Sequence, residues 1–417
     1  MMGRDRFGNA LDPLVGFARG RVLASSTEDG LRLRHGLAVI RARAEAHGAA
    51  SIGIFTGNRR DLLLREGDLE LAEEWIGPAR FAPELAAVIR THLGAKPEAA
   101  TALFNRGSAA LVASMLALAA GGRVVSLVPA GSRSHPSLRR GAALAQAGFD
   151  EVAGLAELHL PSDASLLVIT TVTSSLARLA EADIAAAIAA GHARGVPVLL
   201  DDAYGARIRT ILHGGRPGLE MGADLVVTNA DKAGLPGPRA GIMAGEARLM
   251  ARITATASLI GMEARAPVAL GVLRGLQAWS PEDLRREAHE GLELAEALEG
   301  KLPPGVVRRT DLGPLVSAED VLALTLARAG LVHPPIVPVE ATAALGMILM
   351  ERAGILTTNI AGQPGAHPAL RLKPAGAALA RCGGALAVAA AVAGALDELA
   401  GLIRTPERLP AFLLGAG

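Results

Sequence analysis

The sequence predicts an α/β protein built on a mostly parallel, doubly wound sheet. Between residues 101 and 245, short apolar runs of strand length alternate with segments of helical length, as in repeated strand–helix–strand units. Half of the 417 residues are hydrophobic, so core material is ample, and the length exceeds the usual size of a single core. We therefore expect two domains, with functional side chains gathered at the C-terminal ends of the strands.

Three segments are expected along the chain. Residues 1–47 are predicted to be helical, because residues 31–46 place arginines between apolar residues at helical spacing and Gly48 offers a stop. Residues 48–274 form the predicted large domain, and residues 275–417 form a smaller α+β domain of shorter strands and helices. The arginines of the first segment indicate a solvated face or a dimer contact, with a tRNA-binding helix as the weaker alternative.

Composition excludes several classes of protein. The net charge is +1 with acids and bases interspersed, which gives no electrostatic footprint for a nucleic acid or an anionic membrane. The single cysteine, Cys382, excludes a disulfide framework and a cysteine-based metal site, and we expect no metal. Residues 1–9 lack the apolar core of a secretory signal, and the uncharged run from Cys382 to Leu396 is too short to span a bilayer. We expect a soluble, cytoplasmic protein.

The first candidate site along the predicted sheet is one for a phosphate. Residues 101–104 form a short apolar strand, and Gly107 and Ser108 lie between this strand and the predicted helix 109–119. Free backbone N–H groups and the dipole at a helix N-terminus favour a phosphate. The alternative is an ordinary helix cap without a ligand.

The next two predicted strands also lead into polar residues. Residues 123–128 form a strand, and His135 follows at the start of the next helix. A histidine offers a flat face and a ring nitrogen, although a lone histidine in a loop is usually a surface residue. Residues 165–171 form the other strand, which ends near Thr173. Its hydroxyl can face a ligand or cap a helix that begins at Leu176.

An acid and a lysine at successive strand ends carry the main functional prediction. The buried-strand pattern 196–200 runs into Asp201 and then Tyr204, and the run 225–227 leads into a turn that carries Lys232. Lysine occurs only four times, and unlike arginine it can lose its proton and become a nucleophile. The pair suits pyridoxal 5′-phosphate (PLP), because the lysine can form a Schiff base while the carboxylate pairs with the protonated ring nitrogen. The alternative is a surface lysine in a turn.

The lysine turn resembles that of a known family. The run from Asp231-Lys232 through Gly237-Pro238-Arg239-Ala240-Gly241-Ile242 to Gly245 is similar to the lysine loop of bacterial selenocysteine synthase (L-seryl-tRNA(Sec) selenium transferase). It is more similar still to archaeal PLP proteins related to that enzyme, whose function is poorly defined. These proteins belong to the fold-type I (aspartate aminotransferase-like) superfamily, and the superfamily-level resemblance covers residues 50–417.

The resemblance implies a set of cofactor residues. Lys232 forms the Schiff base, Asp201 pairs with the ring nitrogen and His135 stacks on the ring. Where many relatives place a serine or threonine three residues before the lysine, this chain has Asn229, preceded by Thr228. Further cofactor contacts are implied for Asn105, Gly107, Ser108, Ala109, Thr173, Tyr204, Thr228 and Asn229, with added charge from Arg106.

The resemblance also implies substrate residues. Arg371 lies in a predicted strand between residues 366 and 374, where relatives carry the arginine that holds the substrate α-carboxylate. A planar guanidinium binds a carboxylate with two hydrogen bonds and orients the α-proton. The alternative is a structural arginine. Arg239, in the lysine loop, is the second residue expected to bind substrate.

The implied reaction is β-elimination or β-replacement on a small amino acid or an aminoacyl substrate. The alternatives are a tRNA-dependent conversion of seryl- or phosphoseryl-tRNA, an aminotransferase and a non-catalytic PLP-binding relative. Fold-type I sites are usually completed by a second subunit, so a homodimer or a multiple of dimers is expected. Met262-Glu263-Ala264-Arg265 is the segment expected to face the partner.

Overall fold

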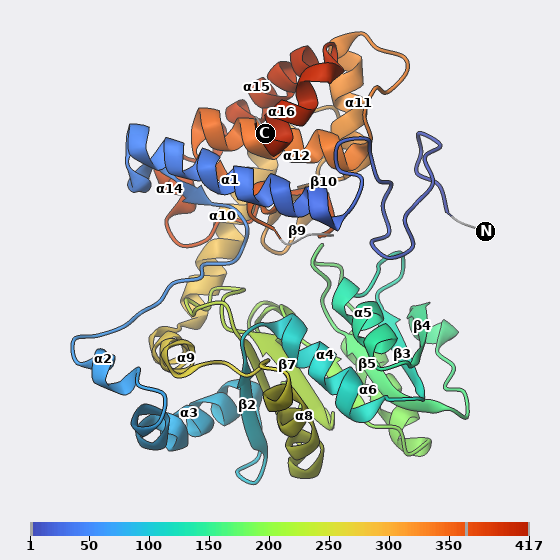
Figure 1. Cartoon of the computed structure of the whole chain (residues 1–417), viewed down its shortest axis with the longest axis vertical. Coiled ribbons are helices and arrows are strands. Elements are labelled where there is room, and N and C mark those ends of the chain that lie inside the picture. Colours follow the sequence, from blue (N-terminus) through green and yellow to red (C-terminus); the bar gives the residue numbers. More distant parts are fainter. Residues whose placement is uncertain (1–2, 363–365, 416–417) are drawn as a thin grey trace. The chain divides into compact units, whose positions relative to one another are not determined.

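The computed structural model describes residues 3–362 and 366–415, which form two compact units (Figure 1). The large unit is Arg59–Arg285, and the small unit combines Met1–Asn58 with Arg286–Gly417. This division differs from the expected one, because the N-terminal segment belongs to the small unit and the second boundary lies after Arg285 instead of residue 274. The helix α10 (Pro281–Glu299) contains that boundary.

The large unit is built on a seven-stranded sheet within the described residues. Its strands follow the order β2-β8-β7-β6-β5-β3-β4, and β8 alone runs antiparallel to its neighbours. The strands are β2 (Ala100–Phe104), β3 (Arg123–Val128), β4 (Gly148–Ala153), β5 (Ala164–Thr170), β6 (Val198–Asp201), β7 (Leu225–Asn229) and β8 (Gly241–Gly245). The sheet is therefore mostly parallel, as predicted.

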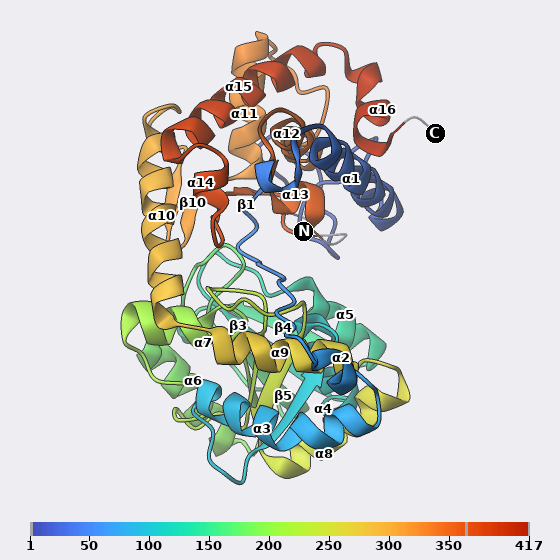
Figure 2. The ribbon, with the colours of Figure 1, turned by 90° about the vertical axis from the view of Figure 1, so that its left-hand side faces the viewer.

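Helices cover both faces of this sheet and form two separate cores. Neighbouring strand residues alternate between them, so that Val125 and Leu127 pack into one core and Val124 into the other. Figure 2 shows α3 and α9 side by side on one face. The first core contains residues of α3 (Ile76–Leu93), α6 (Glu181–Ala193) and α9 (Ala266–Ala278), and the second contains residues of α4 (Gly107–Leu118), α5 (Pro136–Leu144) and α8 (Ala247–Leu259).

The small unit is organised around one buried helix, α12 (Pro338–Ala353). It packs against α1 (Ser26–His47), α11 (Ala318–Ala329) and α15 (Ala385–Ile403). Short strands complete this unit: β1 (Gly53–Ile54) pairs with β11 (Ile355–Leu356), and β10 (Gly313–Val316) lies between β9 (Arg308–Thr310) and β12 (Leu370–Arg371). The shorter elements are α13 (Thr358–Ala361), α14 (Ala378–Arg381) and α16 (Leu409–Leu414).

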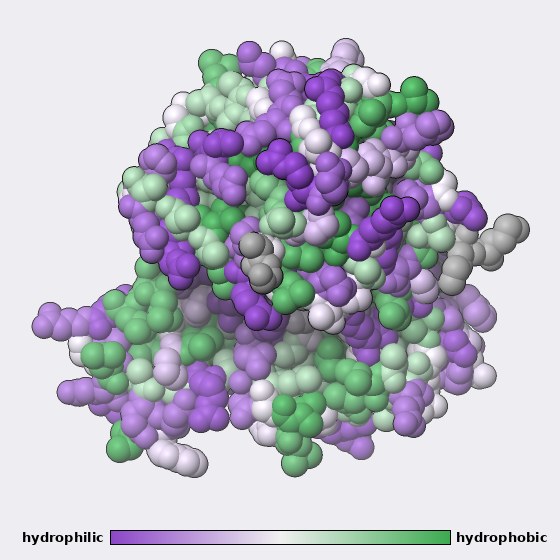
Figure 3. Space-filling model, turned by 45° about the horizontal axis from the view of Figure 1, so that its top comes forward, coloured by the Kyte–Doolittle hydropathy of each residue, from purple (hydrophilic) through white to green (hydrophobic). Residues whose placement is uncertain are grey.

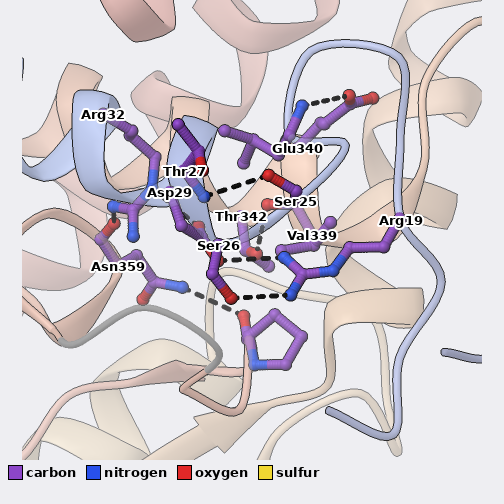
Figure 4. A network of polar contacts seen from close by, with 12 residues as sticks. Arg19, Ser25, Ser26, Thr27, Asp29, Arg32, Val339, Glu340, Thr342 and Asn359 are labelled. Atoms are coloured by element: carbon purple, nitrogen blue, oxygen red, sulfur yellow. Dashed lines mark hydrogen bonds and ion pairs between the residues drawn. The ribbon is translucent and has the colours of Figure 1, made fainter. Parts of the chain in front are cut away.

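A buried polar network explains why the N-terminal segment joins the small unit (Figure 4). Asp29 is only 3% exposed and forms ion pairs with two arginines. Its Oδ2 lies 3.1 Å from Nη1 of Arg19, and its Oδ1 lies 3.4 Å from Nε of Arg32. The backbone N–H groups of residues 22–23 donate to Oε1 of Glu340 on α12, at 2.7 and 3.1 Å. The ion pair of Arg19 with Asp29 holds the residues before α1 against that helix, and the hydrogen bonds to Glu340 tie the segment to α12.

Three helix predictions need correction. The N-terminal segment, expected to be helical over residues 1–47, is helical only in α1, and the described residues before Ser26 form turns and irregular structure. The expected helix from residue 248 to residue 265 ends at Leu259, because Gly261 adopts a left-handed conformation (φ +67°) that closes the helix and turns the chain toward α9. The expected buried helix near Cys382 is α15, which continues to Ile403. Within the described residues it is the one helix long and apolar enough to cross a membrane, but its inner face, including Val388 and Val392, is buried in the core of the small unit.

Candidate functional site

Lys232 lies in a tight, strained turn between β7 and β8. Ala233 has φ +50° and Gly234 has φ +77°, and the N–H of Leu235 closes the turn onto the Lys232 carbonyl at 3.2 Å. A left-handed alanine is uncommon and persists only where the surrounding structure enforces it, as often happens at functional sites. The base of the turn is fixed to β8, because the N–H of Ala230 donates to the carbonyl of Ala240 at 3.0 Å.

The amine of Lys232 is partly buried and lies against an aromatic ring. Nζ lies 4.7 Å from the ring centroid of Tyr204, which is 4% exposed and is the single tyrosine of the chain. Burial lowers the pKa of the Lys232 amine, while the carboxylates of Asp231 and Asp201 act in the opposite direction. A larger fraction of the amine is therefore neutral near pH 7, and neutral amine is the nucleophilic form.

Asp201, at the end of β6, is a buried carboxylate suited to a cationic ligand. It is 5% exposed, and no arginine, lysine or histidine of the described residues lies within ion-pair distance of it. Burial raises its pKa to about 6, against the opposing effect of Lys232 and a hydrogen bond from the N–H of Ala203. A buried acid in this state is stabilised by a nearby positive charge, such as a protonated ring nitrogen.

The neighbouring acid, Asp202, is already neutralised. It is fully buried and receives two hydrogen bonds from Arg209, from Nε at 3.2 Å and from Nη2 at 2.7 Å, and a further one from the Thr171 hydroxyl. This bidentate pair is a structural ion pair of the interior. Of the two adjacent acids, Asp201 is the one suited to a ligand.

The start of α4 forms a cradle of backbone atoms. Arg106 has an extended conformation and precedes the helix, so the N–H groups of Gly107 and Ser108 belong to its unsatisfied first turn. A Cβ on Gly107 would lie 2.2 Å from Oδ1 of Asn229, and one on Gly241 would lie 2.7 Å from the carbonyl oxygen of Arg106. Only glycine fits where these backbones approach so closely, and a helix N-terminus of this kind suits a phosphate.

Three arginines converge on Asp231 beside this cradle. Nε of Arg60 lies 3.3 Å from Oδ2 of Asp231, whose other oxygen is buried without a hydrogen-bond partner among the described residues. The pKa of Arg239 is lowered to about 10 by partial burial and by the charges of Arg60 and Arg106, and burial and Arg60 lower the pKa of Arg106. The three guanidinium groups lie close enough to lower one another's pKa, so this part of the surface attracts an anion.

His135 is a neutral ring at the N-terminus of α5. Its Nδ1 accepts the N–H of Ser137 at 3.2 Å, so the side chain caps the helix. Burial, together with the charges of Lys232, Arg140 and Arg106, lowers the pKa of the ring to about 3. The ring therefore carries no charge at neutral pH, and it lies close enough to Lys232 for the two to interact electrostatically.

Several predicted cofactor residues make local structural contacts. Asn105 is exposed and donates from Nδ2 to the carbonyl of Gly261 at 3.2 Å. Thr228 is fully buried, with its hydroxyl 3.4 Å from the carbonyl of Ala203.

Thr173 accepts the N–H of Ala177 at 3.2 Å within a turn. The alternative expectation of a helix from Leu176 is wrong, because that residue has φ +61° and α6 begins at Glu181. The helix α4 begins at Gly107, two residues before the predicted start, so Ser108 and Ala109 both lie in its first turn.

Arg371 lies in the small unit, whereas the other predicted site residues lie in the large unit. It is 5% exposed, and its Nη2 donates to the carbonyl of His367 at 2.9 Å and lies 3.4 Å from the hydroxyl of Thr358. These contacts hold the guanidinium in place on β12. Its contact with a substrate carboxylate stays a prediction.

Sequence reasoning missed three residues around the lysine turn. Arg207 is fully buried, and its Nε donates to the Lys232 carbonyl at 3.0 Å. Arg60 and Asp231 complete the charged cluster described above. The position of Asp231 next to Lys232 was a signal that could have been used. Nothing in the sequence separates Arg60 and Arg207 from the many other arginines of this chain.

Comparison with known proteins places the chain in a family. No family model matches it. A "UPF0425 pyridoxal phosphate-dependent protein" of Methanothermobacter thermautotrophicus is 34% identical over 387 residues, which cover 92% of this chain and 97% of the relative. A protein of the same name from Methanosphaera stadtmanae is 30% identical over 341 residues, with 82% and 87% covered. The chain belongs to the UPF0425 family of pyridoxal phosphate-dependent proteins.

Family membership confirms PLP as the cofactor and, with solved structures, the predicted fold. N-succinyldiaminopimelate aminotransferase from Mycobacterium tuberculosis superposes with a TM-score of 0.56 at 18% identity, covering 88% of this chain and 99% of that one. The SepCysS–SepCysE N-terminal domain complex gives a TM-score of 0.52 at 14% identity, covering 84% and 95%. At these identities the likeness establishes the fold-type I architecture of this UPF0425 chain.

Proposed function

We propose that this UPF0425 protein is an enzyme that carries PLP on Lys232 and catalyses β-elimination or β-replacement on an amino acid or aminoacyl substrate. The observation that carries the proposal is the environment of the Lys232 amine. It is partly buried, its pKa is lowered by burial, and it lies against Tyr204 near the carboxylate of Asp201. An amine and an acid in these states are what covalent PLP catalysis requires of a protein.

Each residue has a role that follows from its own chemistry. The neutral amine of Lys232 would hold the cofactor and, once displaced by a substrate amine, accept the substrate α-proton. The Asp201 carboxylate would keep the ring nitrogen protonated, so that the bound cofactor can withdraw electrons from the α-carbon. The α4 N-terminus with Arg106 would bind the cofactor phosphate, and His135 would cover the ring. Arg60 and Arg239 add positive charge for the phosphate or a substrate anion.

The lysine loop supports elimination or replacement over the alternatives. Its run from Asp231 to Gly245 resembles selenocysteine synthase, whose reaction replaces a group on the β-carbon. A tRNA-bound substrate is the second candidate, drawn from the same resemblance, but a net charge of +1 gives it no electrostatic support. Amino transfer and a non-catalytic role are outcomes of the test below.

Exposed apolar side chains support the expected homodimer. The face of the molecule in Figure 3 mixes hydrophobic with hydrophilic side chains. In the large unit, Trp75 is 84% exposed, Leu69 is 82% and Leu259 is 86%. Exposed apolar side chains mark a contact with another protein where they gather in one place, and Leu69, on α2 (Asp68–Leu71), and Trp75, just before α3, lie in neighbouring elements of the chain. We infer a dimer of this chain in the cytoplasm, to be tested by its mass in solution and by the loss of dimer in Trp75→Glu.

The first experiment is the absorption spectrum of the protein with PLP, before and after borohydride. Covalent labelling of Lys232 in the wild type, its loss in Lys232→Ala and its retention in Lys301→Ala would support the attachment site, since Lys301 is exposed. Labelling of another lysine would contradict it.

The second experiment separates the reaction classes. Serine derivatives with good leaving groups on the β-carbon should release ammonia and a 2-oxo acid, or exchange the β-group for an added thiol. Consumption of an added 2-oxo acid as amino acceptor, without loss of the β-group, would instead establish amino transfer. The absence of both, with normal PLP labelling, would indicate a non-catalytic relative or a tRNA-bound substrate.

A further inference from the structure

Arg207, on α7 (Gly205–Arg207), is one of the largest fully buried side chains of the protein, and it lies beneath the lysine turn. Its Nε donates to the carbonyl of Lys232 at 3.0 Å, and its Nη2 donates to the carbonyl of Asn229 at 2.8 Å. The same Nη2 lies 3.5 Å from the carbonyl of Ala203, which follows β6. One rigid guanidinium therefore contacts the ends of both strands that carry the lysine and its acid.

We propose that Arg207 is a positioning residue that fixes the main chain on both sides of Lys232 and so aims its amine into the site. This inference rests on the proposed role of Lys232. The carbonyls that Arg207 binds belong to Asn229, the last residue of β7, and to Lys232 itself, so they bracket the strained turn. A planar fork with several donors can hold two such carbonyls at once, which a lysine ammonium cannot do with the same geometry.

The guanidinium is itself held from the outer side by His92 on α3. Nη1 of Arg207 lies 3.0 Å from Nε2 of His92, whose ring meets Trp279 edge-on with 4.9 Å between the ring centroids. Burial and the charge of Arg207 lower the pKa of His92 to about 3, so the ring is neutral and Nε2 can accept the hydrogen bond. The sequence of contacts from α3 through Arg207 to the turn leaves the Lys232 backbone little freedom.

Arg207 also places a permanent positive charge behind the amine. The groups that act on the Lys232 amine are Asp231 and Asp201, which raise its pKa, and Arg60 and Arg207, which lower it together with burial. Because arginine stays protonated at all working pH values, this contribution does not change with pH. Arg207 thus has two separable effects, one through its hydrogen bonds and one through its charge.

Two substitutions separate these effects. Arg207→Lys keeps the charge but loses the fork, and Arg207→Gln loses both. Arg209→Lys is the matched control, because Arg209 is also buried and lies two residues away, but it binds Asp202. The reactivity of Lys232 toward an amine-acylating reagent is measured against pH in protein without PLP, with the exposed Lys96 and Lys301 as internal references. Capture of PLP at Lys232 by borohydride is measured separately.

We expect Arg207→Gln to raise the pH midpoint of Lys232 acylation by about half a unit to one unit, the effect of removing one nearby charge in a partly screened interior. Arg207→Lys should leave the midpoint unchanged but lower PLP capture about tenfold, because the turn is no longer fixed. Arg209→Lys should change neither quantity.

If Arg207→Gln left both the pH midpoint of Lys232 acylation and the capture of PLP at Lys232 unchanged, Arg207 would have only a structural role in the core. If Arg207→Gln fails to fold, Arg207→Lys still tests the proposal. Capture of PLP at Lys232 equal to that of the wild type in Arg207→Lys would overturn the positioning role. Failure of the proposed function is recognised separately, because PLP would then leave Lys232 of the wild type unlabelled while the acylation midpoints could still be measured.

Discussion

A Cβ atom on Gly107 would lie 2.2 Å from Oδ1 of Asn229, so the first residue of α4 and the last residue of β7 meet in van der Waals contact. This contact joins the predicted phosphate cradle to the strand that leads into Lys232. Real Cβ atoms do not approach oxygen atoms this closely, so any larger residue must displace the Asn229 side chain. The geometry of the cradle and the position of the lysine turn are thereby coupled.

Gly107→Ala should weaken PLP binding at least tenfold. Alanine normally favours a helix over glycine by about 1 kcal/mol, so a loss of stability here would reveal the clash with Asn229. The double variant Gly107→Ala/Asn229→Ala should recover stability, because the space is reopened. Thermal unfolding and PLP titration are the measurements, with Gly401→Ala on α15, where a Cβ meets nothing within 4 Å, as the control. Equal PLP binding in the wild type and Gly107→Ala would disprove the cradle.

Asp201→Asn should stabilise the protein without PLP at pH 8. Burial raises the pKa of Asp201 from 3.8 to about 6, so between these values the folded protein holds the proton more tightly than the unfolded chain. Stability therefore falls as pH rises through this window and stays lower above pH 6, by an amount on the order of 3 kcal/mol. The variant removes this cost, so it should unfold at a higher temperature at pH 8 and at a similar temperature to the wild type near pH 4.

The same substitution should weaken PLP binding, because the ring nitrogen loses its carboxylate partner. Asp202→Asn is the matched control, since it leaves the buried Arg209 without its ion pair and should destabilise the protein by about 3–5 kcal/mol at pH 8. A fall in stability of Asp201→Asn at pH 8 similar to that of Asp202→Asn would show that Asp201 is also a structural acid.

The sequence predicted the sheet and the strand-end residues well, because both depend on local patterns. The strand Arg123–Val128 was predicted at its observed bounds. The apolar runs before Asp201 and Lys232 have the pattern of buried strands, and they form β6, which ends at Asp201, and β7. The end of α8 was missed because a glycine within a helical pattern does not reveal that its φ is positive, as it is at Gly261.

The contacts of arginine side chains could not be predicted from local patterns. The chain uses arginine for nearly all of its positive charge, so Arg60 and Arg207 look like surface residues in the sequence. Arg207 approaches Lys232 only because α7 folds back beneath β7, which is a long-range consequence of the sheet order. The membership of residues 1–58 in the small unit likewise depends on the distant pairing of Glu340 with residues 22–23.

Inorganic phosphate should stabilise the protein without PLP through the charged cluster at Asp231. Arg60, Arg106 and Arg239 place three positive charges beside the start of α4, and Nε of Arg60 lies 3.3 Å from Oδ2 of Asp231. Arg239→Gln should lower the apparent affinity for phosphate about tenfold in thermal-shift titrations at constant ionic strength. Arg59→Gln is the control, because Arg59 is already paired with Asp61 at 2.9 Å. An equal loss in both variants would indicate a nonspecific charge effect.

Arg371 is predicted to bind the substrate carboxylate although its side chain already has structural contacts. Its Nη2 donates to the carbonyl of His367 and lies near the hydroxyl of Thr358, so an experiment has to distinguish a structural role of the guanidinium from substrate binding. Arg371→Lys keeps the charge but cannot form the two parallel hydrogen bonds of a guanidinium with a carboxylate. The PLP absorption spectrum provides a binding readout that requires no knowledge of the natural substrate.

The test compares an α-amino acid with the amine that lacks its carboxylate. In Arg371→Lys, the concentration of amino acid needed to change the spectrum should rise about ten- to a hundredfold, while the concentration of amine needed stays the same. The reason is that only the amino acid has a carboxylate to accept the two parallel hydrogen bonds of the guanidinium. Arg32→Lys is the control, since Arg32 is another buried arginine of the small unit and pairs with Asp29. A purely structural Arg371 would weaken both ligands equally and lower the unfolding temperature, and that result would remove Arg371 from the substrate site.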